Sequence, residues 1–443
     1  MVETMLRIDD RNEPPLIRAM PERVVILNDA SVAKGGATGI ALESAELLTE
    51  RGVAVTFISG DDGEAARAAG RPFEIVSLGG THILKGSRAK AVLNGLYNAD
   101  AARFLADWIR RNDTPGTVYH LHGWSKVLSP SVFRALRPVA SRLIVNAHDF
   151  FLVCPNGGFF NFQTGKPCDL APMGLACLGT NCDRRHYAHK LWRSARQSVR
   201  RILCDFGAEG STILAVHEGM LPHLARGGIA EARLKALRNP ATPWREERIA
   251  AERNRAFVFV GRLESDKGID LLAAAARKAG VPLKIIGGGP LEAYLAAGYP
   301  EAERVGWKTR DEIAHEIADA RALVMPSRYR EPFGLVAMEA LTSGLPIVVP
   351  SYAMIAEDVT EGGFGLACDP HDVVALAEAL TRLATDDALV SQMSLRAHRE
   401  ARRLAPTPAE WADALIRLYA DLLPGADAPG QSANRSIRWG SAA

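Results

Sequence analysis

Two glutamates eight positions apart frame a short segment that could bind an anion and hydroxyl groups together. Glu331 and Glu339 bracket the start of an expected helix at Pro332-Phe333-Gly334, which follows an apolar, strand-like run. The N–H groups of a first helical turn point outward and the helix dipole is positive there, so a phosphate can bind. Ionised carboxylates only accept hydrogen bonds, which suits hydroxyl groups. The segment therefore predicts a site for an anion with hydroxyl groups beside it.

A second group of polar residues follows another expected strand. Gly261-Arg262 comes directly after the apolar run 256–260, and Lys267 precedes the next helix. Ligands of open α/β sheets bind beyond the carboxyl ends of the strands, so we expect Arg262 and Lys267 to reach the same anion. A diphosphate that carries a polyhydroxy group would use all of these parts.

In this order, the motifs are similar to those of the retaining nucleotide-sugar glycosyltransferases of family 4, which have the GT-B fold. The segments GRLESDKG and EPFGLVAME carry the resemblance, together with GGGPL at 287–291 and a glycine pair after the first strand. The resemblance spans residues 22–425. It implies a hexosyltransferase that retains the anomeric configuration of the transferred sugar.

The resemblance also implies roles for the matching positions. Arg262 and Lys267 would hold the donor diphosphate and stabilise its departure without a catalytic metal, while Glu331 would bind hydroxyls of the transferred sugar. The other donor-binding positions that it implies are Gly35, Gly36, Gly288, Phe333, Gly334, Leu335 and Glu339, the last of these on the ribose.

Two histidines at the end of one expected strand compete for a further implied role. His122, in HLHG, resembles the family histidine near the sugar and completes a predicted catalytic set with Glu331, Arg262 and Lys267. His120 is its alternative, because we expect the two histidines to face opposite sides of the strand end. Either could instead be a satisfied structural histidine.

Each motif also has a plainer interpretation. The two glutamates could be solvated helix acids, Arg262 with Lys267 a solvated turn, and Gly35-Gly36 a tight strand-to-helix turn. A Rossmann dehydrogenase is a rival, but the glycines fall at 35, 36 and 39 rather than as G-x-G-x-x-G. A sugar-nucleotide epimerase of the same fold and a non-catalytic nucleotide-sugar binding protein are the alternative functions.

The elements that must position these residues repeat twice along the chain. Apolar runs rich in β-branched residues alternate with helical segments, which predicts an α/β protein with parallel sheets. We expect two doubly wound, Rossmann-like domains that face each other across a cleft. The sequence also indicates a last helix with Trp411, Leu415, Leu418 and Leu422 on one side. The resemblance to the GT-B fold implies that this helix crosses back to the first domain.

Polar, Pro-rich stretches divide the chain. The segment LRNPATPWREE at 237–247 has the Asn-Pro and Thr-Pro pairs of a linker. The predicted divisions are a loose leader at 1–21, an acceptor-side domain at 22–238, a donor domain at 239–405, the last helix at 406–425 and a disordered tail at 426–443.

An insertion at 150–182 interrupts the first domain without a clear period. It contains Cys154, Cys168, Cys177 and Cys182, which could hold a structural Zn²⁺ that orders an acceptor-side loop. The cysteine intervals fit no standard zinc finger, and reduced buried thiols or disulfides are the alternatives. No cofactor is expected in catalysis.

A strongly basic helix is expected next. Residues 184–201 hold seven Arg or Lys side chains and no acid, while Tyr187, Leu191, Ala195 and Val199 form one apolar stripe. Such a helix could lie on anionic lipid, which would suit a lipid-linked acceptor. The alternative is that the stripe packs on the domain and the cations are solvated.

The overall composition excludes several classes of protein. The 443 residues include 53 basic and 51 acidic side chains, so the net charge of +2 does not suggest a nucleic-acid partner. Six cysteines are too few for a disulfide scaffold, and no apolar run approaches the roughly 18–20 residues of a membrane-spanning helix. We expect a cytoplasmic enzyme, which could contact the inner face of the membrane, with a nucleotide-sugar donor and a glycan or lipid-linked acceptor in bacterial polysaccharide or cell-surface glycan synthesis.

Overall fold

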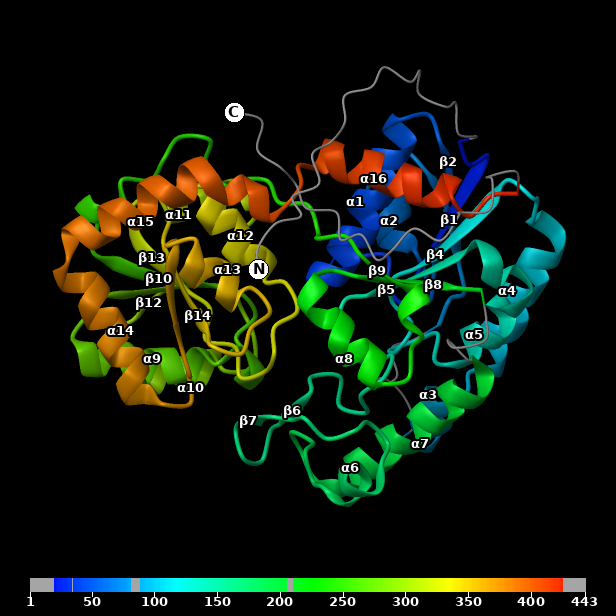
Figure 1. Cartoon of the computed structure of the whole chain (residues 1–443), viewed down its shortest axis with the longest axis horizontal. Coiled ribbons are helices and arrows are strands. Elements are labelled where there is room, and N and C mark those ends of the chain that lie inside the picture. Colours follow the sequence, from blue (N-terminus) through cyan, green and yellow to red (C-terminus); the bar gives the residue numbers. More distant parts are fainter. Residues whose placement is uncertain (1–19, 34, 81–87, 205–209, 425–443) are drawn as a thin grey trace, which may run out of the picture.

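The computed structural model of the chain describes residues 20–424, except 34, 81–87 and 205–209. The predicted leader falls almost entirely outside the described residues, and so does the predicted tail. Figure 1 shows two layered domains side by side, each built on a sheet that is covered by helices. In the described part of the chain, no helix is long and apolar enough to cross a membrane.

The first sheet has seven parallel strands in the order β3-β2-β1-β4-β5-β8-β9. Three of its central strands are buried along their whole length, which explains their near-continuous apolar sequences. The strand order reverses at β1, which pairs with β2 on one side and with β4 on the other, and open α/β sheets bind ligands at such a point. The strands are β1 (Arg23–Asn28), β2 (Ala54–Ser59), β3 (Glu74–Ser77), β4 (Thr117–Leu121), β5 (Leu143–Ala147), β8 (Thr212–Ala215) and β9 (Leu234–Ala236).

The second sheet has six parallel strands in the order β12-β11-β10-β13-β14-β15. Its order reverses at β10, between β11 and β13, so the same rule places a ligand at the carboxyl ends of β10 and β13. The strands are β10 (Ala256–Val260), β11 (Leu283–Ile286), β12 (Glu303–Gly306), β13 (Ala320–Val324), β14 (Ile347–Pro350) and β15 (Gly365–Cys368).

Helices connect the strands within each domain (Figure 1). Those of the first domain are α1 (Gly36–Glu50), α2 (Glu64–Ala68), α3 (Arg88–Leu96), α4 (Ala99–Asn112), α5 (Ser131–Leu136), α7 (Tyr187–Leu203) and α8 (Leu221–Arg226). Those of the second domain are α9 (Ile269–Ala279), α10 (Glu292–Gly298), α11 (Arg310–Glu316), α12 (Leu335–Thr342), α13 (Ala356–Glu361), α14 (Val373–Thr385) and α15 (Asp387–Glu400).

The last helix, α16 (Pro408–Ala420), crosses back to the first domain, as the sequence predicted. It begins with a capping box between Thr407 and Glu410 that satisfies two free backbone N–H groups. Trp411 and Leu415 then pack into one buried apolar cluster with side chains of β1, β2 and α1. The first domain therefore uses a segment from the far end of the chain to cover its sheet.

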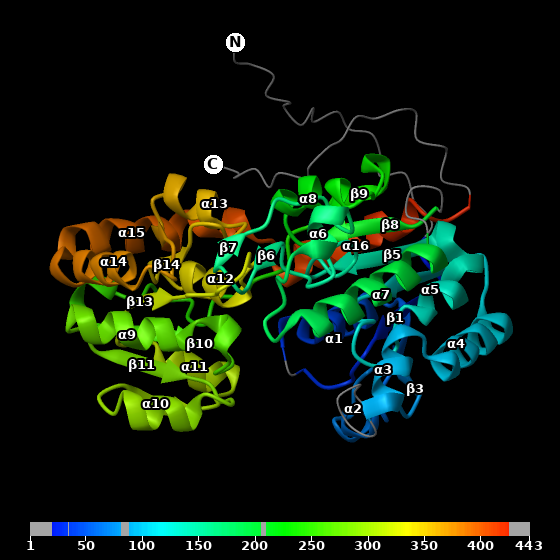
Figure 2. The same cartoon turned by 90° about the horizontal axis from the view of Figure 1, so that it is seen from below.

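The cysteine-containing insertion bridges the two domains. It forms a small antiparallel pair, β6 (Phe160–Asn161) with β7 (Lys166–Pro167), and a short helix, α6 (Leu175–Gly179). Figure 2 shows β6 and β7 between the domains. The ring of Phe160 lies 5.2 Å from that of Tyr352 and 5.5 Å from that of His371, both in the second domain. The insertion is therefore ordered by packing across the interface, and no periodic pattern in its own sequence could reveal that.

Replacing Trp411 with alanine tests the packing of α16. The side chain is 1% exposed, so Trp411→Ala should lower the free energy of unfolding by about 3–5 kcal/mol, measured by chemical denaturation. The matched change Val374→Ala, at a half-exposed position of α14, should stay within about 0.5 kcal/mol. Equal effects of the two changes would contradict the burial of α16 against the first domain.

Candidate functional site

A buried ion pair stands at the carboxyl end of the second sheet. The Nζ atom of Lys267 donates to Glu331 Oε2 at 2.9 Å and to the Tyr329 hydroxyl at 2.8 Å. Ser327 Oγ donates to the same carboxylate oxygen at 2.8 Å. The structure thus brings together a lysine and a glutamate that are 64 residues apart, on the loops that follow β10 and β13.

The pair keeps both of its charges although it is largely buried. Burial alone would lower the pKa of Lys267, but the Glu331 carboxylate and the Tyr329 hydroxyl outweigh it and raise that pKa. Burial alone would raise the pKa of Glu331, and the charge and hydrogen bond of Lys267 bring it below the usual value. The site therefore presents a fixed ammonium and a fixed carboxylate.

Glycines allow the loops of this site to approach each other. Gly268 has a left-handed backbone with φ of 70°, and a Cβ atom there would lie 1.9 Å from the carbonyl oxygen of Pro326. A Cβ atom on Gly287 would lie 1.8 Å from the carbonyl oxygen of Gly261. At Gly288 a Cβ atom would meet no other atom within 4 Å, so the backbone of this predicted donor residue is accessible to a ligand.

The amino end of α12 faces the glycine pair of the first domain. Gly334, with φ of 74°, precedes the helix, and Phe333 is buried beneath this turn. The Leu335 side chain lies against Gly36, where a Cβ atom would come within 2.9 Å of it. Gly36 and the adjoining Gly35 of the first domain therefore face the amino end of α12 in the second domain. Free N–H groups at a helix amino end favour an anion.

Glu339 and Arg262, the other two charged residues predicted to bind the donor, each pair with another charged side chain. Glu339 pairs with Arg310, whose guanidinium also donates to the carbonyl oxygens of Thr242 and Pro243. Burial raises the pKa of Glu339, and Arg310 opposes that rise. Arg262 pairs with Glu264 and its side chain is 48% exposed. The structure places Arg262 on the same loop as Lys267, in a more exposed position.

The expectation that His120 and His122 face opposite sides of their strand is wrong. Side chains two residues apart point to the same face, and the two rings lie 4.1 Å apart. His120 Nδ1 contacts the Tyr419 hydroxyl of α16 at 2.8 Å, and its Nε2 contacts Asn146 Oδ1 at 3.3 Å. His120 is therefore a satisfied structural histidine.

His122 has a partner at one nitrogen. Its Nδ1 lies 3.0 Å from His148 Nε2, and its own Nε2 is buried without a hydrogen-bond partner. Burial keeps all three histidines neutral: the pKa is about 3 for His120 and about 4 for His148, and that of His122 is well below its usual value. His122 can therefore offer one nitrogen to a ligand.

Three of the four insertion cysteines contact buried polar groups. Cys154 Sγ donates to Asn156 Oδ1 at 3.1 Å, and the amide of Asn156 donates to Cys182 Sγ at 3.2 Å. Lys190 Nζ lies 3.3 Å from Cys177 Sγ and 3.2 Å from Cys182 Sγ. Among the described residues, no group of three or more Cys, His, Asp or Glu side chains is arranged to hold a metal ion. Zinc binding by Cys154, Cys168, Cys177 and Cys182 stays a prediction.

The alternative in which the apolar stripe of helix α7 packs on the domain is wrong, because the helix faces solvent with that stripe and buries several of its cations. Leu191 is 48% exposed and Ile202 is 83% exposed, whereas Lys190, Arg196 and Arg200 are buried. Arg196 donates to the carbonyl oxygen of Ser125 and lies over the rings of Trp124, Phe151 and Trp192. The buried cations are stabilised by carbonyl oxygens, sulfur atoms and aromatic faces, and the apolar side chains remain in solvent.

Several contributors to the site were missed in the sequence. They are Ser327, Tyr329 and Arg310 around the two glutamates, and Asn146, His148 and Tyr419 around the histidines. His148 and Ser327 are the last residues of the strand-like runs 142–148 and 321–327, a signal that could have drawn attention to them. Tyr419 carries no such signal, because only the return of α16 brings it to the sheet.

Comparison with known proteins finds a family model and several relatives that match part of this chain. Residues 241–402 match the family model of glycosyl transferases group 1. Glycogen synthase of Mycobacterium tuberculosis is 31% identical over 279 residues, which cover 58% of this chain and 63% of that protein. A GDP-mannose-dependent alpha-mannosyltransferase of Corynebacterium glutamicum is 33% identical over 135 residues, or 30% of this chain and 32% of that protein. The chain thus spans less than two thirds of the length of these relatives.

Solved structures match nearly the whole chain at low sequence identity. Sucrose-phosphate synthase from Thermosynechococcus elongatus has a TM-score of 0.67 and 16% identity, over 90% of this chain and 99% of that chain. Anabaena HepE in complex with UDP has a TM-score of 0.64 and 14% identity, over 90% of this chain and all of that chain. The GT-B fold with two Rossmann-like domains is confirmed.

A carboxylate at the interface between the domains has a raised pKa. Burial and the negative charge of Glu339 raise the pKa of Glu43, on α1, to about 7. The neutral form is favoured by the folded state, so the stability is fully present below pH about 4.5 and is lost as the pH rises through about 7. We expect Glu43→Gln to raise the melting temperature relative to the unmodified chain at pH 8 and to have less effect at pH 5.

Glu50, exposed on the same helix, provides the control for this effect. The difference in melting temperature between Glu50→Gln and the unmodified chain should be the same at pH 5 and at pH 8. A pH profile of Glu43→Gln that runs parallel to that of the unmodified chain would contradict the raised pKa.

Proposed function

We propose that this protein is a glycosyltransferase that moves a sugar from a nucleotide-diphosphate donor to a glycan or lipid-linked acceptor. The observation that carries the proposal is the Lys267–Glu331 pair at the carboxyl end of β10 and β13, next to the amino end of α12. The match of residues 241–402 to glycosyl transferases group 1 supports it, and so do relatives named glycogen synthase and alpha-mannosyltransferase.

The site supplies the charges that such a transfer needs. When the bond to the donor sugar breaks, negative charge develops on the departing diphosphate, and Lys267, Arg262 and the N–H groups at 333–335 offer positive charge to it. Glu331 accepts hydrogen bonds from hydroxyls of the sugar, and Glu339 from those of the ribose. No metal ion is required in this scheme, because side chains and the helix amino end provide the positive charge. Retention of the anomeric configuration, as in family 4, is part of the same proposal.

The acceptor would bind on the first domain, against His122 and the glycine pair. Catalysis then consists mostly of holding the acceptor hydroxyl against the donor sugar while the diphosphate leaves. The named functions of the relatives favour a role in bacterial glycan synthesis. A cytoplasmic location is part of the same proposal. Solved structures of Anabaena HepE, which has a similar fold, contain UDP or UDP-glucose, and this supports a nucleotide-sugar donor.

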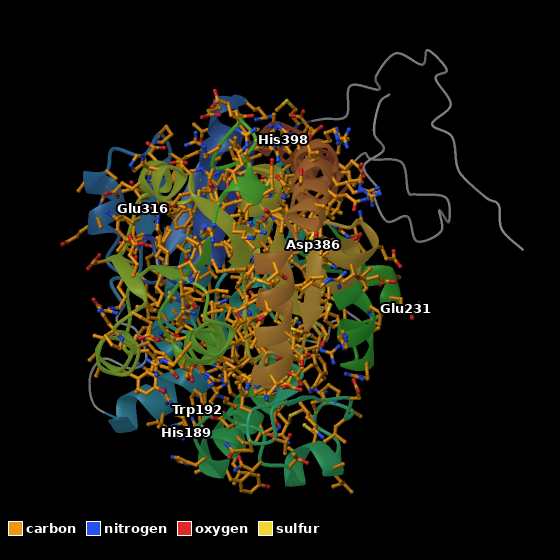
Figure 3. All side chains as sticks on the ribbon, turned by 90° about the vertical axis from the view of Figure 1, so that its left-hand side faces the viewer. His189, Trp192, Glu231, Glu316, Asp386 and His398 are labelled. Atoms are coloured by element: carbon orange, nitrogen blue, oxygen red, sulfur yellow. The ribbon has the colours of Figure 1, made fainter. Side chains whose placement is uncertain are left out.

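Peripheral contact with an anionic membrane is a second part of the proposal, and the exposed face of α7 supports it. Leu191 and Ile202 are exposed there, Leu93 on neighbouring α3 is 66% exposed, and Leu175 on α6 is 91% exposed. Trp192 of α7 donates to a carbonyl oxygen of α3, which holds these helices together. Figure 3 shows Trp192 and His189 of α7 at the lower edge of the molecule. Arg184, Arg185 and Arg201, at the two ends of this helix, are exposed. An exposed apolar face with such cations near it suits an anionic lipid surface.

Loss of the ion pair tests the transferase proposal. Lys267→Ala and Glu331→Ala should each lower glycosyl transfer by about 10²-fold or more. The first removes a positive charge that acts on the departing diphosphate, and the second removes the acceptor for sugar hydroxyls and leaves Lys267 without its buried partner. The measurement is product formation with UDP-, GDP- and ADP-sugars and oligosaccharide acceptors, with the melting temperature as a check on folding. Arg277→Ala, which breaks an exposed ion pair with Glu301, is the control and should keep full activity.

The products of the same assay separate the alternatives. A new free sugar nucleotide without any acceptor would indicate an epimerase, and donor binding without turnover would indicate a binding protein. Full transfer by both ion-pair variants would show that the assigned site is wrong.

Charged substitutions on α7 test the membrane contact. The protein should co-sediment with anionic liposomes at low salt, and Leu191→Asp with Ile202→Asp should abolish that binding because charge is placed on the apolar face. Leu395→Asp, at a 40% exposed position of α15, is the matched control. Failure of the unmodified protein to co-sediment would refute the contact and leave the transferase proposal standing.

A further inference from the structure

A group of mostly basic side chains connects the two domains beside Glu331. We call it the arginine cluster, and it consists of His223 and Arg226 of α8, Arg330 of the loop after β13, and Asp169 of the insertion. Arg330 directly precedes Glu331 in the sequence. Figures 1 and 2 both show α8 on the side of the first domain that faces the second. Three separate parts of the chain therefore meet in this cluster.

Both nitrogens of the His223 ring lie against guanidinium groups. Arg226 Nη2 lies 3.2 Å from His223 Nδ1, and Arg330 Nη1 lies 3.2 Å from His223 Nε2. Burial and the two guanidiniums lower the pKa of His223 to about 4, so the ring is neutral. A guanidinium only donates, whereas a neutral imidazole has one acceptor nitrogen and one donor nitrogen. Whichever nitrogen carries the proton, one of the two contacts therefore brings two donors together.

Arg330 has few acceptors within the chain. Its Nη2 lies 3.8 Å from Asp169 Oδ1, which is beyond hydrogen-bond distance, and its Nε is buried without a hydrogen-bond partner. In the described part of the chain, the His223 ring is the only group that the side chain of Arg330 contacts at hydrogen-bond distance. Its side chain is only 14% exposed, so water can compensate little of this. Because an unpaired buried donor costs free energy, Arg330 favours an acceptor from outside the chain.

Arg226 is better paired, but it depends on the same carboxylate. Its Nη1 donates to the carbonyl oxygen of Asp169 at 3.3 Å and lies 3.4 Å from Asp169 Oδ1, while its Nη2 lies 3.4 Å from the carbonyl oxygen of Cys168. The Asp169 side chain is 76% exposed, so water screens most of its charge. Two guanidinium charges thus share one solvated carboxylate, and the cluster has an excess of positive charge and of donors.

Aromatic rings hold the cluster in place. The Arg226 guanidinium lies 4.8 Å from the centre of the Phe159 ring, and the His223 ring lies 5.2 Å from Phe159 and 5.6 Å from Phe150. Both phenylalanines belong to the buried core. The donors of the cluster are therefore positioned before a ligand binds, which lowers the entropy cost of binding.

We propose that Arg226, Arg330 and His223 form a binding site for a phosphate-type anion between the domains, apart from the Lys267–Glu331 pair. Oxygens of a phosphate would accept from both guanidiniums and from the N–H group of His223, which removes the contact between two donors. A phosphate suits this site better than a carboxylate does, because its oxygens point in several directions and the donors approach from two domains.

The phosphate has two sources that the chemistry of the site does not separate. It could be a phosphate group of the acceptor, because a lipid-linked sugar can carry phosphate between the sugar and the lipid. Arg330 adjoins Glu331, so this site lies beside a residue assigned to the transferred sugar. The assignment to the acceptor rests on the proposed function. The other source is free inorganic phosphate, whose binding does not depend on that function.

The first test is a titration of the full chain with inorganic phosphate, without donor or acceptor, followed by nitrogen-15 NMR of the His223 imidazole. Its signals, assigned by their absence from His223→Gln, should shift and saturate with a dissociation constant of about 1 mM or lower. Sodium chloride at the same ionic strength should not reproduce the shift. Signals that do not respond to phosphate, or that respond equally to chloride, would overturn the site, and this result needs no variant to fold.

Variants show which residues hold the phosphate. Arg226→Gln and Arg330→Gln should each weaken binding by about tenfold or more, because each removes charged donors, with the melting temperature as a check on folding. Arg277→Gln, at an exposed ion pair of α9, is the matched control and should bind like the unmodified chain. Lys267→Ala should keep the response of His223. If Lys267→Ala abolishes that response and the two glutamine variants keep it, the phosphate lies at the donor site and the proposal is wrong.

Transfer to one acceptor sugar, with and without a phosphate on its reducing end, separates the two sources. Arg226→Gln should raise KM for the phosphorylated acceptor by about tenfold and leave KM for the other unchanged if the phosphate belongs to the acceptor. Equal KM effects on the two acceptors, with saturable phosphate binding in the unmodified chain, would assign the site to free phosphate. Phosphate binding at His223 in a protein that transfers no sugar would overturn the proposed function and uphold the site.

Discussion

The buried ion pair of Lys267 and Glu331 is the constraint on which the rest of the donor-side structure depends. An ammonium and a carboxylate can leave water only when they meet each other and find further hydrogen-bond partners, because desolvation otherwise costs more than the attraction returns. Tyr329 and Ser327 are those partners. The loop after β10 must therefore close onto the end of β13, and it can do so because Gly268 has no Cβ atom to strike the backbone there.

The two domains meet through contacts from several parts of the chain. Arg184, at the end of the insertion, pairs with Asp266 at 2.9 Å, directly beside Lys267. The rings around Phe160 add an aromatic contact, while α16 is anchored in the core of the first domain. The insertion has the least periodic sequence, and the last helix lies farthest along the chain from the domain that it covers. Both nevertheless help to position the two domains that line the site.

Much of the fold was predictable because its signals are local. Alternating apolar strands and helices indicate parallel sheets wherever they occur, and the positions of Lys267 and Glu331 just after strand ends predicted that these two residues would meet. The histidine prediction failed on a point of strand geometry, since residues two apart share a face. The orientation of α7 could not be read from its stripe, because Arg196 is stabilised by rings and a carbonyl oxygen from other segments.

The sequence by itself determined the α/β class, the division into two domains with one sheet each, and a last helix with one apolar side. These follow from periodicity and spacing, which each short segment carries on its own. Only the tertiary structure decided that Lys267 pairs with Glu331, that α7 exposes its apolar side, and that Tyr419 reaches His120. Each of those is a contact between groups far apart in the chain, and its energy depends on burial and on exact hydrogen-bond partners that no local pattern contains.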